Sequence, residues 1–527
     1  MSYTSEHTGA EIDEAIGNVA DKADKTNVLE KDNTTEFTPT GDYNPATKKY
    51  VDDNASGDLS ESVIVNVSTE DSASVDGQII TLTDLSVSGD SDTYTLDTGE
   101  TSHTFHVVVG HIYKVSVNDK TGYGTPSETA EFEAVAGYIR NISLQYIQII
   151  RYGFKRDKNN SDPDTRIEYL YDAVGMTPAY MDFGVEFNEG DWGTFIDEVQ
   201  RQVMLKYDGT VDYELDPTDD TKKLSDGTTS DVSNTAYQGN AMVAFRKFKW
   251  VYRYEDTSYE YVIFSNTQYD ANYKALAHTN ENGDIQDEFY WGKYMGSYSD
   301  SKLRSLADES VMVSQTANTE VSRAQNNGSG HYIIYNSAWN YICDLLTLVS
   351  KSDDSQSKFG SGRSKTTNSS GINTGSLKTS GLFYGYTDET SDVKIFGIEC
   401  FWGNYWQRMA GLILAEDGKF KVQNTPPYNF DGSGYEDSGI SPSGSSGSYV
   451  DTASVTELGY LPKTLGGSSS TYYCDGMWYD FDDPNYARVG GGWDHGLLVG
   501  SRSLTVGGPA SHTNANIGSR LSYITPA

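Results

Sequence analysis

The sequence predicts a multidomain α+β protein that is rich in β structure. The chain has 527 residues, which exceeds the usual size of one domain and predicts several. It contains 51 glycines against 13 prolines, with many Ser, Thr, Asn and Asp residues, a composition typical of strands joined by turns. Hydrophobic residues make up 36% of the chain, enough to form packed cores. We expect three parts, over residues 1–57, 58–149 and 150–527.

The acidic composition excludes several classes of partner. The formal net charge is −37 and the isoelectric point is near 4.4, whereas binding to nucleic acid needs a basic surface.

No stretch approaches the roughly 18 apolar residues of a membrane span. The N-terminus lacks the basic and apolar regions of a signal peptide. We therefore expect a protein that is made in a cytoplasm, with no nucleic-acid partner, membrane insertion or standard secretion signal.

Residues 1–57 carry a short helical pattern. Ile12, Ile16, Val19 and Ala23 are spaced by four, three and four residues, as in the apolar seam of a coiled coil. β-branched residues at both core positions of such a seam favour trimers. Two interpretations remain open: the seam of a homotrimer, or one face of a small amphipathic helix.

A turn and a second short helix follow. Pro39 and Gly41 indicate the turn, Asn44 can cap a helix, and Pro45 suits the first helical turn. Together with residues 7–16, the stretch 40–53 closely resembles the virion-attachment segment of tail-fibre and tail-tip proteins of tailed bacteriophages. This resemblance covers about a tenth of the chain. It implies a structural protein of the phage tail whose N-terminus docks on other tail proteins.

Residues 58–149 predict an antiparallel β-sandwich of immunoglobulin-like size, acting as a spacer. Short apolar runs alternate with turn signals such as Asp76-Gly77 and Asp119-Lys120-Thr121-Gly122. The Cys–Trp–Cys pattern of antibody domains is absent from this stretch. The predicted strands are 63–67, 78–82, 93–96, 103–109, 112–117 and 142–149.

Residues 150–527 predict a large mixed region. Periodicity and composition indicate helices over 194–205 and 337–349, strands over 242–248, 259–265 and 393–398, and long surface loops over 352–381 and 431–448. The absence of a fixed sequence period argues against a β-helix or a propeller.

The segment 490–521 has a regular set of glycine and aromatic positions, here called the frame, and irregular side chains between them, here called the filling. Glycines and an aromatic residue recur in it, and the positions between them carry unrelated side chains. Glycine is needed where the backbone takes a positive φ or approaches another segment closely. The frame therefore indicates a specified backbone, and the filling indicates a surface loop for binding. An ordinary glycine-rich terminal hairpin is the alternative.

Together with the aromatic run 396–411, residues 321–325 and the helix through Trp339, this segment resembles the C-type-lectin-like fold shared with formylglycine-generating enzymes. The branch in question is formed by the variable proteins of diversity-generating retroelements. The resemblance implies a C-type-lectin-like domain whose C-terminal segment, about 490–521, varies and binds ligand. The implied scaffold positions are Gly491, Trp493, Gly496, Gly500, Asn516, Ile517, Gly518, Arg520 and Leu521, with the arginine buried against loop carbonyls. The implied outward-facing, ligand-binding positions are Asp494, His495, Leu497, Leu498, Ser501, Arg502, Ser503, Thr505, Gly508, Ser511 and His512.

Catalysis, metals and cofactors are not expected. Formylglycine-type oxidase chemistry needs a reactive thiol pair that binds copper, and Cys343, Cys400 and Cys474 do not reproduce that pattern. The spacing from Asp157 to Glu168 partly matches a calcium loop, but Asp162 stands where glycine is required, so we expect a solvated acidic turn.

The combined expectation is a phage tail receptor-binding protein, located on the virion, trimeric, and adhesive toward a protein or glycan of a bacterial surface. Two alternatives remain. One is a tail or baseplate component without receptor binding, and the other is a tailspike that degrades a glycan with paired carboxylates.

Overall fold

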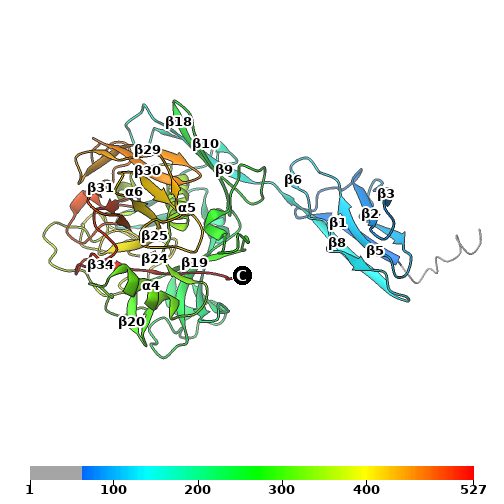
Figure 1. Cartoon of the computed structure of the whole chain (residues 1–527), viewed down its shortest axis with the longest axis horizontal. Coiled ribbons are helices and arrows are strands. Elements are labelled where there is room, and N and C mark those ends of the chain that lie inside the picture. The colour runs from blue at the N-terminus through cyan, green and yellow to red at the C-terminus, as the bar shows by residue number, and fades with distance from the viewer. Residues whose placement is uncertain (1–61) are drawn as a thin grey trace, which may run out of the picture. The chain divides into compact units, whose positions relative to one another are not determined.

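The structure, a computed structural model, describes residues 62–527, which belong to two compact units whose boundary in the chain falls between Gln148 and Ile149 (Figure 1). The predicted attachment segment 1–57 and its trimer seam lie outside the described residues. Residues 62–148 are called the N-terminal unit, and residues 149–527 the C-terminal unit. Within 62–527 no helix is long and apolar enough to cross a membrane.

The N-terminal unit is a β-sandwich of two four-stranded sheets, with strand orders β4-β1-β8-β6 and β3-β2-β5-β7 (Figure 1). Its strands are β1 (Ser62–Thr69), β2 (Ile79–Asp84), β3 (Asp90–Thr95), β4 (Ser102–His106), β5 (Ile112–Val117), β6 (Tyr123–Gly124), β7 (Phe132–Glu133) and β8 (Ile139–Gln148). Alternate residues of β1, such as Val63, Val65 and Val67, are buried, as expected for strands with one face on a core.

The sandwich is confirmed, but it is not wholly antiparallel. Strands β1 and β8 run parallel, with Ser62 opposite Ile139 and Thr69 opposite Tyr146. The first residues of β1 and β8, Ser62 and Ile139, lie opposite each other, so both strands begin at the same end of the sandwich and run in the same direction.

The C-terminal unit is mostly β structure arranged in three larger sheets and three hairpins. A four-stranded sheet has the order β10-β9-β18-β17, from β9 (Arg151–Asp157), β10 (Ile167–Tyr171), β17 (Trp250–Glu255) and β18 (Tyr259–Ser265). A seven-stranded sheet has the order β15-β14-β13-β16-β19-β35-β22, from β13 (Gln200–Lys206), β14 (Val211–Asp216), β15 (Asp219–Lys223), β16 (Gly239–Phe245), β19 (Phe289–Gly292), β22 (His331–Ile333) and β35 (Leu521–Ile524).

The third sheet, of ten strands, has the path β27-β26-β25-β32-β33-β31-β29-β30-β28, with β34 paired to β25. Its strands are β25 (Trp406–Leu414), β26 (Phe420–Val422), β27 (Glu436–Asp437), β28 (Ser443–Gly444), β29 (Ser448–Thr456), β30 (Gly459–Leu465), β31 (Gly476–Tyr479), β32 (Asn485–Val489), β33 (Leu504–Val506) and β34 (Ile517–Ser519). The hairpins join β11 (Tyr180–Asp182) to β12 (Glu186–Asn188), β20 (Ser297–Ser299) to β21 (Lys302–Arg304), and β23 (Lys394–Ile395) to β24 (Ile398–Glu399).

Helices are few and short in the described part of the chain. They are α3 (Gly193–Val199), α4 (Ala317–Gln325), α5 (Asn336–Ser350) and α6 (Ser355–Phe359), with short 3₁₀ turns η1 (Leu276–His278) and η2 (Gly496–Leu498). The helix predicted over 337–349 is confirmed as α5, and the strand over 259–265 as β18. The helix predicted over 194–205 is wrong beyond Val199, because residues 200–206 form β13, whose side chains are mostly buried and which pairs with β14 and β16.

Helix α5 is the centre of the C-terminal unit. All 15 of its residues are buried, and it contacts η1, β9, β25, β30 and α6. The polar side chains of a helix that is buried on every side need hydrogen-bond partners within the protein, because water cannot reach them. Asn340 does so by accepting a hydrogen bond from the Tyr460 backbone N–H at 2.8 Å.

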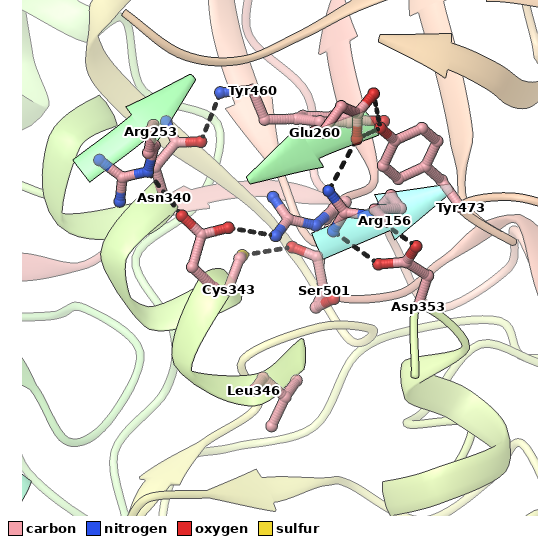
Figure 2. Close-up of polar contacts among 12 residues, drawn as sticks. Arg156, Arg253, Glu260, Asn340, Cys343, Leu346, Asp353, Tyr460, Tyr473 and Ser501 are labelled. Carbon is pink, nitrogen blue, oxygen red and sulfur yellow. Dashed lines mark hydrogen bonds and ion pairs between the residues drawn. The ribbon is translucent and has the colours of Figure 1, made fainter. Parts of the chain in front are cut away.

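Around α5 the core contains buried ion pairs (Figure 2). Arg156 binds Asp353 through two nitrogens, at 2.7 and 2.8 Å, and Glu260 at 2.8 Å. Tyr473 donates to the same Glu260 carboxylate at 2.6 Å. In each of these bonds a buried charge meets a partner, which is the condition for tolerating charge in a core.

A second buried group centres on Asp344 of α5. Its two carboxylate oxygens accept hydrogen bonds from Arg253 of β17 and from Arg502, each at 2.6 Å. Burial is the largest single influence on the pKa of Asp344 and acts to raise it, but the two guanidinium groups together keep that pKa below its usual value. This carboxylate therefore joins three segments that are distant in sequence.

Two histidines are buried in neutral form. His278 places Nε2 at 3.1 Å from the Phe245 carbonyl oxygen, and His331 lies against Tyr523 with ring centres 4.7 Å apart. Burial lowers the pKa of His278 to about 3 and that of His331 to about 4.

The first prediction concerns the ion pairs of Asp344. Replacing Asp344 by Asn leaves Arg253 and Arg502 buried without a counter-charge, so the free energy of unfolding should fall by about 3–5 kcal/mol. The matched control is Asp164→Asn, which breaks the exposed pair with Lys358 and should cost less than about 1 kcal/mol. Urea denaturation measures both; equal costs would contradict the assigned role of Asp344.

The second prediction concerns acid stability. Both histidines bind fewer protons in the folded than in the unfolded state, so their contribution is complete above the unfolded pKa of about 6.5 and is lost as the pH falls below it. Between pH 7 and 5, each should remove about 2 kcal/mol from the free energy of unfolding.

Urea titrations at pH 7 and 5 test this loss. The variants His278→Gln and His331→Gln should each show a smaller difference between the two pH values than the parent protein. A pH dependence identical to that of the parent would show that the histidine binds its proton as readily in the folded as in the unfolded protein, which contradicts a buried neutral ring.

Candidate ligand-binding site

A pocket of about 290 Å³ lies on the ten-stranded sheet beside the C-terminal segment. Four neighbouring strands in the order β25-β32-β33-β31 form its floor and walls. The residues that line it are Trp406, Ser446, Trp478, Tyr479, Asp480, Arg488, His495, Thr505, Gly507, His512, Asn514, Asn516 and Ile517.

The register of the strands explains why these side chains converge. Trp478 pairs with Thr505, Thr505 pairs with Arg488, and Arg488 pairs with Arg408. Directly opposed residues of neighbouring strands present their side chains on the same face of a sheet. One row across four strands therefore carries an indole, a hydroxyl and two guanidinium groups.

Three rings form an aromatic wall. Trp406, Trp478 and His495 stand edge to face, with centroid distances of 5.3–5.4 Å between each pair. His495 Nδ1 lies 3.0 Å from Asp494 Oδ1, and burial lowers the pKa of His495, so its ring is neutral at neutral pH. A neutral, edge-to-face cluster presents apolar ring surface to a ligand.

The expected scaffold positions fix the backbone around this pocket. Gly491 has φ +77°, and a Cβ there would overlap Val499. A Cβ at Gly500 would overlap the Asp475 carboxylate, and Gly496 has φ +60°. Trp493 packs edge to face on Tyr405 at 5.3 Å. At Gly491 and Gly500 the neighbours therefore leave room for glycine but not for a larger residue.

The end of the segment is equally fixed. The Asn516 carbonyl accepts the Trp406 N–H at 2.9 Å, and Ile517, Gly518 and Leu521 are buried. Arg520 is fully buried, and its guanidinium donates to Gln407 and to the backbone carbonyls of residues 292, 293, 399 and 400 at 2.7–3.1 Å. The expectation of a buried arginine that holds loop carbonyls is confirmed.

The outward-facing positions are confirmed only in part. Asp494, Leu497, Ser511 and His512 are exposed, and His495 and Leu498 are half-buried. The expectation of outward-facing side chains is wrong for five positions that are buried: Ser501, Arg502, Ser503, Thr505 and Gly508.

The burial of these five positions has a physical cause. Residues 504–506 form β33 inside the ten-stranded sheet, between β31 and β32. Just before it, the Ser501 carbonyl accepts from Trp339 and Cys343 of α5, both at 3.1 Å, and Arg502 binds Asp344 (Figure 2 shows the Cys343–Ser501 contact). Ser503 donates to the Leu498 carbonyl at 2.6 Å. Gly508 lies against Arg488 and His512, where a Cβ would come within 3.1 Å of a guanidinium nitrogen.

The pocket unites some of the predicted residues with others that the sequence did not indicate. His495, Thr505, His512, Asn516 and Ile517 line it. Trp406 lies in the aromatic run 396–411, which contributes to the family resemblance but is not among the predicted ligand-binding positions. Trp478 and Arg488 carry no local signal, because only the pairing of β31, β32 and β33 brings them to the C-terminal segment.

A second cluster of chemically active groups lies in the core. Atoms of Asp392, Glu399 and Cys400 that could bind a metal ion lie within 4.8 Å of one another. Glu399 already accepts the N–H groups of Gly375 and Leu377 at 2.7 and 2.8 Å, and Asp392 accepts the Ser376 hydroxyl at 2.5 Å. Burial raises the pKa of Glu399 to about 7. These bonds give the cluster a role in holding loops together.

The three cysteines are free and buried. Burial raises the pKa of Cys343, Cys400 and Cys474 above the usual thiol value, so each is protonated at neutral pH. In the predicted acidic turn, Glu168 lies on β10 and pairs with Lys155 at 2.9 Å. The pocket on the ten-stranded sheet is the one lined by residues of the C-terminal segment.

No protein-family model matches the chain, and no curated protein has a matching sequence. Among solved structures, it is similar to a mutant of the shaft pilin SpaA of Lactobacillus rhamnosus GG, at 14% identity, with 33% of this chain and 66% of that chain covered and a TM-score of 0.14. It is also similar to a streptococcal ancillary pilin, at 13% identity, with 39% and 58% covered and a TM-score of 0.16. A third similar structure is the major pilin SpaD of Corynebacterium diphtheriae, at 10% identity, with 39% and 57% covered and a TM-score of 0.14. The chain spans less than two thirds of the length of each of these pilins.

Proposed function

We propose that the chain is a receptor-binding protein of a bacteriophage tail, which attaches the virion to a bacterial surface ligand through the pocket on the ten-stranded sheet. The observation that carries the proposal is the pocket itself, in which aromatic rings and a buried arginine meet the exposed part of the C-terminal segment. Tyrosine- and tryptophan-lined recesses with a polar rim are common at recognition sites.

In this proposal residues 150–527 form the C-type-lectin-like head that the sequence resembles. The anchoring of the C-terminal segment supports a display role. Strand β33 holds one side of the loop 507–516 in the ten-stranded sheet, and β34 holds the other side by pairing with β25. Residues 511–515 between these anchors are exposed. A short loop with both ends fixed presents its side chains in a reproducible arrangement.

The remaining parts have supporting roles in the proposal. Residues 1–57 dock on other tail proteins, the sandwich separates the head from the particle, and three copies act together. Several weak contacts made at once give a strong overall attachment, because each further contact is intramolecular.

The third prediction tests adhesion by competition. Purified full-length chain, incubated with host cells, should reduce adsorption of the phage that carries it. Trp478→Ala, which removes one wall of the pocket, should weaken this competition by at least about tenfold, in line with the typical cost of losing an aromatic anchor. Plaque counts of unadsorbed phage provide the measurement.

The control is Trp250→Ala, which removes a half-buried tryptophan on β17 that does not line the pocket. It should compete like the parent protein, and circular dichroism should show both variants folded. Failure of the parent chain to compete would sink the adhesion proposal and favour a purely structural tail component. Full competition by Trp478→Ala would move the receptor site elsewhere.

A further inference from the structure

Arg488 is a buried residue whose guanidinium has no hydrogen-bond or ion-pair partner among the described residues. The residue is 5% exposed, and its Nε is shielded from solvent with no hydrogen-bond acceptor. Among the described residues, no carboxylate lies within ion-pair distance of it. Arg156, Arg408 and Arg502, which are buried to a similar degree, each lie within 2.8 Å of a carboxylate oxygen. A buried charge without a partner is costly, so it demands an explanation.

The neighbours of Arg488 leave a positive charge at the floor of the pocket. Arg408 stands opposite Arg488 in the strand register, but its Nε donates to Glu320 at 2.6 Å, whereas Arg488 has no carboxylate within ion-pair distance among the described residues. Burial and the nearby Arg408 lower the pKa of Arg488 to about 10, which still leaves it charged at neutral pH. One unit of positive charge therefore remains for an anionic group from solution.

The walls and rim define what else the ligand carries. Trp478 and His495 are half-exposed and pack at right angles to each other beside the buried Trp406, and their free ring surface suits the C–H face of a sugar ring. Ser446, Asn514 and Asn516 on the rim offer hydrogen-bonding groups for hydroxyls. The volume of about 290 Å³ is at the lower end for small-molecule pockets and suits one monosaccharide unit.

We propose that this pocket binds a carboxylated sugar unit, such as a uronic or sialic acid, with the carboxylate on Arg488 and the ring against Trp406 and Trp478. This inference rests on the proposed function and specifies its ligand class. Arginine also binds phosphate, but a phosphate monoester carries up to two charges, and one free guanidinium matches a single carboxylate better. Asp480 on the rim disfavours a second anionic group at the opening.

The test measures tryptophan fluorescence of the full-length chain during titration with sodium glucuronate, N-acetylneuraminate, glucose and glucose 6-phosphate. At least one of the carboxylated sugars should bind about ten or more times more tightly than glucose, and raising the salt concentration should weaken that binding. Tighter binding of glucose 6-phosphate than of both acids would assign the pocket to phosphate. Equal binding of all four, or of none, would overturn the inference.

Arg488→Met is the decisive variant. It should reduce the affinity for the carboxylated sugar at least about tenfold and leave the affinity for glucose unchanged. Because the Arg488 side chain makes no hydrogen bond or ion pair with the described residues, the melting temperature should stay the same or rise, whereas replacing an arginine that stabilises the fold would lower it. The control is Arg323→Met, an arginine stacked on Tyr298 outside the pocket, which should keep the affinity for the acid.

The two proposals fail in distinguishable ways. If Arg488→Met competes for host cells as well as the parent while Trp478→Ala does not, the adhesion proposal stands and the carboxylate assignment is wrong. If the parent chain binds the acid but never competes with the phage, the sugar site stands and the adhesion proposal is wrong. A fall in melting temperature for Arg488→Met, with unchanged affinity for the acid, would make Arg488 a structural residue.

Discussion

The carboxylate of Asp344 is the constraint on which the arrangement of the C-terminal unit depends. It lies on a helix with no exposed residue and accepts one arginine from β17 and another from the C-terminal segment. Removing three charged groups from water is expensive, and only close, well-directed bonds offset that cost. The geometry of this group therefore leaves little freedom to the segments it joins. The Arg502 backbone N–H also donates to Asp475 at 2.7 Å, which fixes the chain at the point where β33 is about to begin.

The consequence reaches the pocket through the register of the sheet. Once residues 500–503 are fixed, β33 enters between β31 and β32 with a single alignment, and Thr505 comes to lie between Trp478 and Arg488. A shift by one residue would turn each of these side chains to the opposite face. A salt bridge in the core thus determines the composition of a surface recess that it does not touch.

Sequence reasoning predicted the local features and missed those that depend on distant pairing. The sandwich strands and helix α5 follow from periodicity, and the buried role of Arg520 is implied by the family resemblance of the C-terminal segment. The burial of Arg502 could not be predicted, because arginine is usually exposed and Asp344 lies 158 residues away in the chain. Likewise, β13 continues where a helix was expected, since its pairing with β16 outweighs the helical pattern of residues 200–205. The floor of the pocket needs three strands in register, a property that no local pattern encodes.

The charges of the molecule act at two ranges. The chain carries a formal net charge of −37, which repels anionic polymers, but salt screens this repulsion beyond about 8 Å at physiological ionic strength.

The positive charge of Arg488 acts only within the recess, where surrounding protein shields it from solvent ions. An anionic sugar would gain attraction only after its ring had entered the recess beside Trp478. In the proposed function, the ligand must therefore fit the shape of the recess before its charge contributes to binding. The exposed residues Asp494, Leu497 and Ser511, which neighbour the pocket residues His495 and His512 in the chain, can change at a cost of about 0.5 kcal/mol or less, while the floor stays constant. Variation of the loop would alter which sugar chain fits, and Arg488 would preserve the preference for a carboxylated sugar.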